Sequence, residues 1–288
     1  MATVLITGTS KGIGLSTALT LARGGHTVYA TMRNPASAPE LAETAAQEAL
    51  PINISAMDVD SDSSVATAIA AIYESGVPID VLVNNAGVER DGSIEELPMA
   101  DFRATMETNY FGALRCIKAV IPHMRQHSSG CIINVTSVAG RVSTSPLGPY
   151  AASKFALEAL SEALAQEVKA FNVRVAIVEP GIIDTPMAHK IESPVPASIY
   201  PQRRRMAHYF SASLRNPTHP IVVAEKIQSI IESGTWQFRH PVGPNAEPTI
   251  AKRRSTSDED YIALHASDDD TWYTAMEKNT GLVIRPRK

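Results

Sequence analysis

Short apolar segments alternate along the chain with longer segments in which apolar residues recur every three or four positions. The short segments are rich in β-branched residues, which is typical of parallel strands buried on both faces. The longer segments have the period of amphipathic helices. The predicted strands are 2–7, 27–32, 52–58, 81–84, 131–137 and 173–179, with a last one near 236–239. The predicted helices are 13–23, 63–75, 98–127, 150–171 and 222–233.

This alternation predicts an α/β fold: a single-domain, Rossmann-type, doubly wound and mainly parallel seven-stranded sheet with helices on both faces. We assign the domain to residues 1–240. Six prolines interrupt 182–220, which we expect to form a substrate lid. Residues 241–288 are Pro-rich, then basic, then acidic, and we expect a C-terminal extension whose order the sequence leaves open.

Composition narrows the classes of function. The 288 residues are 44% hydrophobic with a net charge of −4, which suits a large core and provides no positive field for nucleic acid. The two cysteines, Cys116 and Cys131, are too few for a disulfide framework and are interpreted as small packing residues. The eight histidines lack metal-ligand spacing, so no catalytic metal is predicted.

The chain also lacks the sequence features of membrane insertion and export. No stretch reaches the ~18 uncharged apolar residues of a membrane span. The first residues enter a predicted strand without the features of a signal peptide. We therefore expect a cytoplasmic protein whose partner is a small-molecule substrate held in a pocket.

A glycine-rich segment, Thr-Gly-Thr-Ser-Lys-Gly-Ile-Gly at 7–14, follows the first predicted strand and opens the first predicted helix. Glycines at such a turn allow a tight bend and a close backbone approach, so that the helix N-terminus faces a pyrophosphate. The segment therefore predicts a dinucleotide site. Its candidate contacts are Gly8, Ser10, Lys11, Gly12, Ile13 and Gly14.

The same residues support two other interpretations. Gly8-Thr-Ser10-Lys-Gly12 matches the G-x-S-x-G pattern of an α/β-hydrolase nucleophile. A hydrolase draws part of its oxyanion hole from an upstream loop, and only seven residues precede Gly8, so a hydrolase using Ser10 is the weaker hypothesis. A purely structural glycine turn is the other alternative.

The end of the second predicted strand bears on the choice of cofactor. Met32 stands where a dinucleotide fold has an acidic residue for the ribose 2′-hydroxyl. Arg33, which follows, is placed to pair with a 2′-phosphate, and Lys11 supplies a second positive charge. These residues predict NADP(H) in preference to NAD(H). Two solvated surface cations are the alternative.

Tyr150 and Lys154 lie four positions apart and therefore share one face of a predicted helix. This spacing is weak evidence when taken alone, because tyrosines and lysines meet at it by chance. Ser137 ends a predicted strand thirteen residues earlier. All three side chains can therefore meet at the carboxyl edge of the sheet, where ligands of α/β proteins bind.

With these residues in place, the chain resembles the classical short-chain dehydrogenase/reductase family, nearest to its hydroxysteroid and retinol dehydrogenase branch. The resemblance covers about residues 2–235 and implies a homodimer or homotetramer. The matching motifs, in the family's order, are TGxxxGIG at 7–14, NNAG at 84–87, Asn109 in Thr-Asn-Tyr, Ser137, YxxxK at 150–154 and Pro180-Gly181.

The resemblance implies an NAD(P)(H)-dependent oxidoreductase that interconverts a carbonyl and an alcohol, with Tyr150 as general acid and base. A phenol has a reference pKa of ~10, so the nearby Lys154 ammonium is needed to favour the tyrosinate. Ser137 holds the substrate oxygen. In the family, Asn109 holds a water linked to the lysine, and a core amide with all its hydrogen bonds satisfied is the alternative. A catalytically silent NADP(H) sensor is the alternative function.

The resemblance also implies cofactor contacts beyond the glycine-rich segment. A carboxylate at Asp58 meets the adenine amine, and the backbone after Asn84 lines the adenosine ribose. Pro180-Gly181 turns the chain beneath the nicotinamide. These further implied positions are Asp58, Val59, Asn85, Ala86, Gly87, Tyr150, Lys154, Pro180, Gly181, Ile183 and Thr185.

The expected lid contains several large apolar or aromatic side chains. They either form an inner face suited to a hydrophobic alcohol or ketone, or simply pack within the lid. These residues are Met187, Tyr200, Met206, Tyr209 and Phe210.

Two charged stretches are expected to face solvent. Glu89-Arg90-Asp91 follows the NNAG motif and either alters a pocket wall or, as we expect, forms a solvated loop. Arg203-Arg204-Arg205 either meets an acidic group or, as we expect, forms a solvated helix face.

Overall fold

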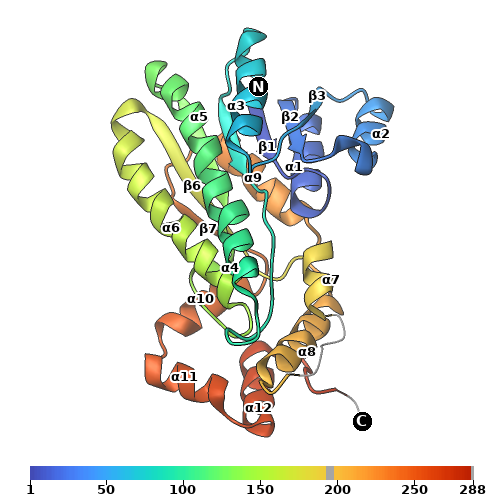
Figure 1. Cartoon of the computed structure of the whole chain (residues 1–288), viewed down its shortest axis with the longest axis vertical. Helices are drawn as coiled ribbons and strands as arrows, with labels where there is room; N and C mark the ends of the chain where they lie inside the picture. The colour runs from blue at the N-terminus through green and yellow to red at the C-terminus, as the bar shows by residue number, and fades with distance from the viewer. Residues whose placement is uncertain (193–197, 287–288) are drawn as a thin grey trace.

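Seven parallel strands form one sheet in the order β3-β2-β1-β4-β5-β6-β7 (Figure 1). The computed structural model describes residues 1–192 and 198–286. The predicted doubly wound sheet of seven strands is confirmed. The strands are β1 (Thr3–Thr7), β2 (Thr27–Met32), β3 (Ile52–Ala56), β4 (Val81–Asn84), β5 (Gly130–Val135), β6 (Val173–Pro180) and β7 (Arg239–Val242).

Helices cover both faces of this sheet, and each face has its own apolar core. Side chains alternate along a strand, so Val4 and Ile6 of β1 enter one core and Leu5 enters the other. Helices α1 (Gly12–Arg23) and α9 (Ile221–Ser233) pack into the first core. Helices α3 (Asp62–Glu74), α5 (Ala113–Gln126) and α6 (Gly148–Val168) pack into the second.

The strand order places a ligand crevice at one point of the sheet. After β1 the chain builds β2 and β3 on one side, and it then returns to pair β4 with the other side of β1. Crevices at the carboxyl ends of the strands open at such a switch point. The loops after β1, β4, β5 and β6 therefore form the walls of the candidate site.

Several predicted boundaries differ from the structure. The predicted helix 98–127 consists of α4 (Met99–Met106), a π-helical turn at Glu107–Gly112, and α5. Strands β3 and β5 end two residues before Asp58 and Ser137, which therefore lie in loops. Helices α2 (Glu40–Gln47) and α7 (Pro186–Glu192) were not predicted, and α8 (Gln202–Leu214) was expected only as a helix face at 203–205, without bounds.

The last strand begins at Arg239, so its prediction near 236–239 was wrong. Pairing with β6 buries His240 and Val242, whereas Trp236 stays half exposed. The position of this strand is therefore set by the residues that become buried when they pair with β6. The apolar character of Trp236 does not set it. Strand β7 also crosses the expected domain boundary at residue 241.

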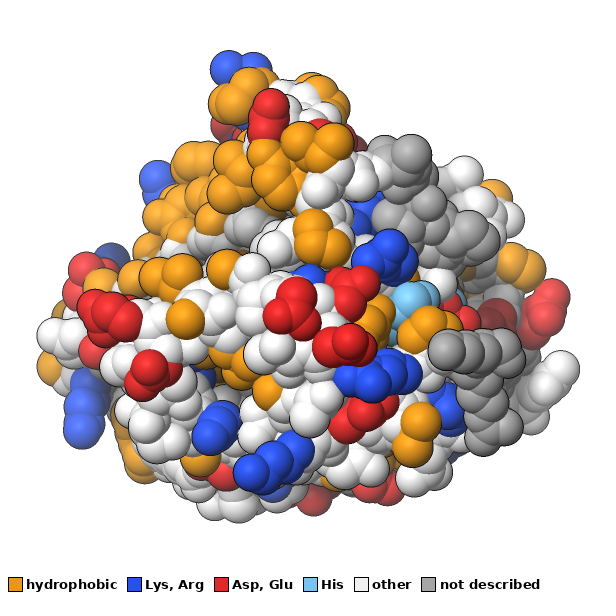
Figure 2. Space-filling model, turned by 90° about the horizontal axis from the view of Figure 1, so that it is seen from below, with side chains coloured by type: hydrophobic (Ala, Val, Ile, Leu, Met, Phe, Trp, Pro, Cys, Tyr) orange, Lys and Arg blue, Asp and Glu red, His pale blue; other side chains and the backbone are white. Residues whose placement is uncertain are grey.

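The C-terminal segment is helical and packs against the lid. It forms α10 (Ala246–Arg254), α11 (Asp258–Ala266) and α12 (Asp269–Thr280), which Figure 1 shows at one end of the molecule, with α12 next to α8. Trp272 and Tyr273 of α12 form a small separate core with Ala212 of α8. Figure 2 shows acidic and basic side chains interspersed over this end of the molecule.

The prediction that 203–205 form a solvated face holds for Arg204, which is exposed, but was wrong for the buried Arg205 and for Arg203, which is only partly exposed. Arg203 pairs with Asp91 at 2.7 Å, so neither side chain is a free surface charge. Arg205 is 2% exposed and donates to Asp269 at 2.8 Å and to the Ser267 carbonyl at 2.8 Å. These arginines tie α8 to the loop after β4 and to the start of α12.

Two minor expectations can be compared directly with the structure. Cys116 and Cys131 are buried free thiols on α5 and β5, which confirms their interpretation as packing residues. Within residues 1–192 and 198–286, no helix combines the length and the apolar character needed to cross a bilayer.

Candidate active site

The loop between β1 and α1 forms a cradle because its glycines lack a Cβ. Gly8 has φ +72°, and a Cβ there would lie 2.7 Å from the Ala86 Cα. At Gly14 a Cβ would lie 2.2 Å from the Gly8 carbonyl oxygen. The two glycines therefore allow the loop to fold tightly on itself and against the loop after β4, which brings its backbone to the first turn of α1, where a dinucleotide pyrophosphate is expected to bind.

Asn85 and Thr7 hold this cradle against the loop that follows β4. The Asn85 side-chain amide donates to the Thr7 carbonyl at 2.9 Å and to the Gly8 carbonyl at 3.0 Å. In return, the Thr7 hydroxyl accepts from the backbone amides of Asn85 at 3.0 Å and Ala86 at 2.9 Å. The two loops therefore behave as one rigid wall.

A cavity of about 370 Å³ follows the carboxyl edge of the sheet from this cradle to the lid helices. Its volume falls within the ~300–1,000 Å³ of typical ligand pockets. Every residue predicted to contact the cofactor lines it, although the sequence places these residues far apart. They are Gly8, Ser10, Lys11, Gly12, Ile13, Gly14, Arg33, Asp58, Val59, Asn85, Ala86, Gly87, Tyr150, Lys154, Pro180, Gly181, Ile183 and Thr185.

Helix α6 presents Tyr150 and Lys154 to this cavity from its first two turns. The Lys154 ammonium is buried, donates to the Val135 carbonyl at 2.9 Å, and lies 5.6 Å from the centroid of the Tyr150 ring. Burial lowers the pKa of Lys154 to about 8, against an opposing effect of Glu158. Lys154 therefore still carries its charge in most molecules at neutral pH.

Tyr150 is a protonated phenol in the absence of ligands. Burial raises its pKa to about 12, the Ser137 hydroxyl opposes the rise, and the nearby charge of Glu89 adds to it. In this state the side chain is ready to donate a proton. The reverse reaction requires additional positive charge near the phenol.

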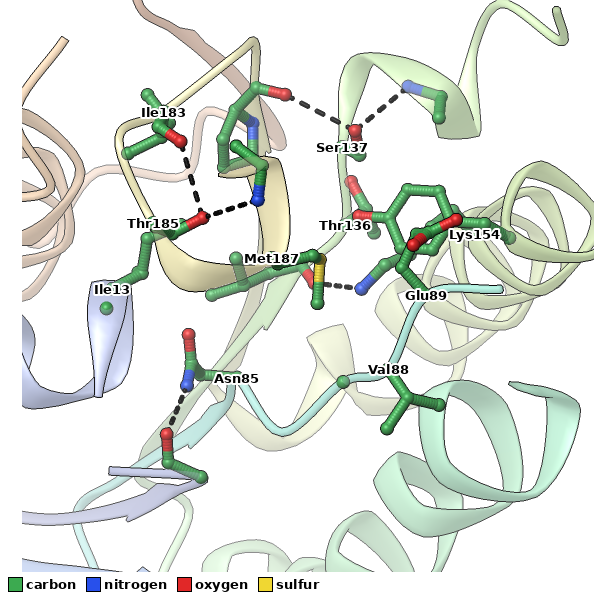
Figure 3. A pocket seen from close by; sticks show the side chains of 18 of the residues that line it. Ile13, Asn85, Val88, Glu89, Thr136, Ser137, Lys154, Ile183, Thr185 and Met187 are labelled. Atoms are coloured by element: carbon green, nitrogen blue, oxygen red, sulfur yellow. Dashed lines mark hydrogen bonds between the residues drawn. The ribbon is translucent and has the colours of Figure 1, made fainter. Parts of the chain in front are cut away.

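Ser137 lies two residues beyond β5, where it caps the short 3₁₀ turn Val138–Gly140. Its hydroxyl oxygen accepts from the Ala139 amide at 3.1 Å and donates weakly to the Pro180 carbonyl at 3.4 Å. Figure 3 shows Ser137 and Lys154 on one side of the pocket, with Ile183 and Thr185 on the other. The cap fixes the serine beside the tyrosine.

Asn109 lies behind the pocket wall and does not line the cavity. It belongs to the π-helical turn, a feature common at functional sites. Its side-chain oxygen accepts from the Val88 amide at 2.8 Å, and its nitrogen donates to the Val88 carbonyl and to Ser153, each at 2.9 Å. The side chain thus fixes the loop after β4 against α6, in agreement with the alternative of a satisfied core amide.

Glu89 is not in a solvated loop, so that expectation was wrong. Its side chain lines the cavity with only 4% of the residue exposed. Burial raises the pKa of this carboxyl to about 7, with a further rise from Asp91 and opposing effects of Lys190, Arg90 and Arg203. The sequence signal was a charged residue two positions after the NNAG motif, but its burial could not be inferred from that position.

The lid supplies an apolar wall of the cavity, which agrees with the interpretation of its large side chains as an inner face. Met187, Met206, Tyr209 and Phe210 line the cavity, whereas the Tyr200 hydroxyl instead contacts the surface residue Glu95. Asn245 and Thr249 of the C-terminal segment complete the wall. Sequence reasoning missed these two residues because they lie beyond the matched motifs.

The hydrolase hypothesis loses support at this point. Ser10 lines the cavity, but the described residues that line it include no histidine to act as its base.

Comparison with known proteins identifies the family. The family model for short chain dehydrogenases matches residues 2–195, so the chain belongs to the short chain dehydrogenase family. The chain is 37% identical over 281 residues to retinol dehydrogenase 8 of Bos taurus, which covers 92% of this chain and 85% of that protein. It is 33% identical over 244 residues to estradiol 17-beta-dehydrogenase 1 of Rattus norvegicus, covering 83% of this chain and 70% of that protein.

A solved structure agrees with both the fold and the family. The crystal structure of a short-chain dehydrogenase from Streptomyces avermitilis matches with a TM-score of 0.78 and 27% identity, and covers 97% of this chain and 99% of that chain. The resemblance to an oxidoreductase family near its hydroxysteroid and retinol dehydrogenase branch is thereby confirmed.

Proposed function

We propose that this protein is an NADP(H)-dependent oxidoreductase that interconverts the carbonyl and alcohol groups of an apolar substrate. The observation that carries the proposal is the convergence of Tyr150, Lys154 and Ser137 in the cavity that begins at the glycine-rich cradle. A bound nicotinamide would supply the hydride there. The protein itself supplies the proton, the oxygen-binding hydroxyl and the phosphate site.

Tyr150 acts as general acid in reduction. Ser137 donates a hydrogen bond to the substrate carbonyl, which orients that oxygen toward the phenol and stabilises its developing negative charge. The Tyr150 proton then moves to this oxygen, and the Lys154 ammonium stabilises the tyrosinate that remains. In the oxidative direction the same proton returns to Tyr150.

The lining of the cavity supports both the cofactor and the substrate class. Lys11 and Arg33 line the cradle end and carry the positive charge that a 2′-phosphate needs. Met187, Met206 and Phe210 line the lid end and offer an apolar, adaptable surface. Two relatives are named for retinol and estradiol, and an apolar alcohol suits this lining.

The Tyr150→Phe variant tests the mechanism. We expect a loss of turnover of about 10²–10⁴-fold, the usual contribution of a positioned acid or base. Cofactor binding, followed by the quenching of protein fluorescence, should persist, because the phenol proton is not needed to hold the dinucleotide. Turnover is followed by the loss of NADPH absorbance with a panel of ketones, aldehydes and steroids.

A matched control removes a hydroxyl that is also buried. The Tyr73 hydroxyl has no hydrogen-bond partner in the described chain and lies outside the cavity. Tyr73→Phe should therefore keep its turnover. Unchanged turnover in Tyr150→Phe contradicts the mechanism, and tight cofactor binding without turnover across the panel favours the redox-sensor alternative.

A further inference from the structure

Glu89, in the loop after β4, places an unpartnered carboxyl in the cavity whose lid end is apolar. The residue is 4% exposed, and neither carboxyl oxygen has a hydrogen-bond partner in the part of the chain that the structure describes. Buried polar groups without partners are costly and rare, and they occur mostly at functional sites. The proposed mechanism makes no use of this carboxyl.

The backbone around Glu89 is held rigidly. Asn109 binds both the amide and the carbonyl of Val88. Arg90 donates to the Glu89 carbonyl at 2.9 Å and to Asp101 at 3.2 Å. Figure 3 shows the Glu89 side chain leaving this loop on the side of Ser137 and Lys154. The direction of the carboxyl is therefore set by the loop and not by a partner.

The neighbouring charges are already used elsewhere or lie at the surface. Arg203 pairs with Asp91, and Arg90 pairs with Asp101. Lys190 of α7 is exposed. These groups influence the pKa of Glu89 through their charge, and the charge of Glu89 raises the pKa of Tyr150. The carboxyl is thus available to a ligand group. It also lies close enough to Tyr150 for its charge to act on the phenol.

We propose that Glu89 determines substrate specificity by accepting a hydrogen bond from a hydroxyl or ammonium group that the apolar substrate carries beside its reacting carbon. The ionised carboxylate only accepts hydrogen bonds, so in that state the donor must come from the ligand. This inference rests on the proposed oxidoreductase function. A pocket built around such an acceptor rejects the analogue that lacks the donor, since the carboxyl then stays unpaired.

Three ketones test this proposal: a medium-chain methyl ketone, its hydroxymethyl analogue and its aminomethyl analogue. Each is assayed for kcat/KM with NADPH, or with NADH if that cofactor binds better. The unchanged chain should prefer at least one of the two donor-bearing ketones over the plain ketone by about 10- to 100-fold, the usual effect of a hydrogen bond to a charged group. The plain ketone serves as the internal reference of each variant.

Two variants distinguish recognition of a substrate hydroxyl from recognition of a substrate ammonium group. Glu89→Met should reduce both preferences to within about threefold of unity, because it removes the acceptor and keeps the volume. Glu89→Gln keeps one acceptor oxygen but no charge, so it should retain part of the hydroxyl preference and lose the ammonium preference. Glu95→Gln is the matched control, since Glu95 is exposed in the following segment and lies outside the cavity.

A binding measurement provides a readout that is independent of turnover. A medium-chain amino alcohol should raise Tm more than the matched plain alkanol in the unchanged chain with NADP⁺ present, and this difference should vanish in Glu89→Met. If ketones are turned over without any preference, or if Glu89→Met lowers all three rates equally, the inference is overturned and the proposed function stands. If no ketone is turned over but the difference in Tm is present, recognition by Glu89 stands and the proposed function fails.

Discussion

Arg33 is the residue on which we base the proposed preference for NADP(H). It is exposed at the rim of the cavity, directly after the buried Met32 that stands where an acidic residue would favour NAD(H). A guanidinium binds a phosphate through a charge-assisted hydrogen bond. NADPH binding should therefore be more sensitive to this side chain than NADH binding.

The Arg33→Ala variant should raise KM for NADPH by about 10- to 100-fold, the usual effect of one hydrogen bond to a charged group, with KM for NADH changed by less than about threefold. Steady-state rates with both cofactors measure this. Arg103→Ala removes an equally exposed arginine outside the cavity and serves as the control. Equal effects on both cofactors would show that Arg33 does not contact the 2′-phosphate.

Glu89 also links the pocket to pH. Burial raises the pKa of its carboxyl from an ordinary 4.5 to about 7 in the folded chain. The protonated form therefore stabilises the fold below pH 4.5, and this contribution is lost as the pH rises to about 7. The lost stability amounts to about 3 kcal/mol for a change of this size.

Glu89→Gln cannot ionise, so its Tm should rise relative to that of the unchanged chain between pH 4.5 and 7, with a constant difference above that range. Thermal melts at a series of pH values measure this, with Glu95→Gln as the exposed control. Parallel Tm curves for Glu89→Gln and the unchanged chain would contradict the raised pKa.

At the scale of elements, the close approach of α1 to the loop after β1 depends on Gly14, where there is no space for a side chain. A Cβ at Gly14 would lie 2.2 Å from the Gly8 carbonyl oxygen and 2.5 Å from the Asn85 amide nitrogen, which itself holds the cradle. Neither group can move without opening the loop. The first turn of α1 and the loop after β4 are therefore mutually dependent.

Gly14→Ala should weaken cofactor binding by at least about 10-fold and lower Tm, since overpacking costs ~1–3 kcal/mol. A fluorescence titration with NADPH and a thermal melt measure the two effects. Gly148→Ala is the control, because a Cβ there meets only Ile94 at 3.6 Å, an ordinary contact. Full cofactor affinity in Gly14→Ala would show that the cradle tolerates displacement.

At the scale of the whole molecule, the C-terminal helix α12 is attached to lid helix α8 by an apolar cluster and by the carboxylate of Asp269. Asp269 at the start of α12 accepts from Arg204 and from the buried Arg205 of α8. Removing it leaves the Arg205 guanidinium buried without that charge partner. Because Asn245 and Thr249 line the cavity from the same segment, this attachment also supports the pocket wall.

Asp269→Ala should lower Tm by roughly 3–8 °C, as expected for the loss of a hydrogen-bonded charge pair in a chain of this size. Asp270→Ala provides a close control, since Asp270 lies in the same helical turn and its side chain makes an exposed pair with Arg285 at 3.5 Å. Differential scanning calorimetry compares the two variants. Equal Tm values would show that the Arg205 contact contributes nothing to stability.

Local pattern was sufficient for the sheet, the glycine-rich cradle and the positions of Tyr150 and Lys154. Strand and helix periods, turn glycines and a four-residue helical spacing are properties of residues close together in the sequence. Short elements such as α2 and α7 were missed because they span too few turns to establish a period. The last strand was misplaced because pairing with β6, and not its own apolar residues, sets its register.

The sequence by itself therefore predicted the fold class, which follows from short-range periods, and the residues proposed for proton transfer, which follow from the motifs shared with the family. Only the tertiary structure decided that Glu89 faces the pocket without a partner, that Arg205 is buried against Asp269, and that the C-terminal segment helps to wall the site. Burial and pairing depend on contacts between distant residues, such as the 64 positions between Arg205 and Asp269. The sequence alone does not show whether a charged residue will be exposed to water or buried in the protein.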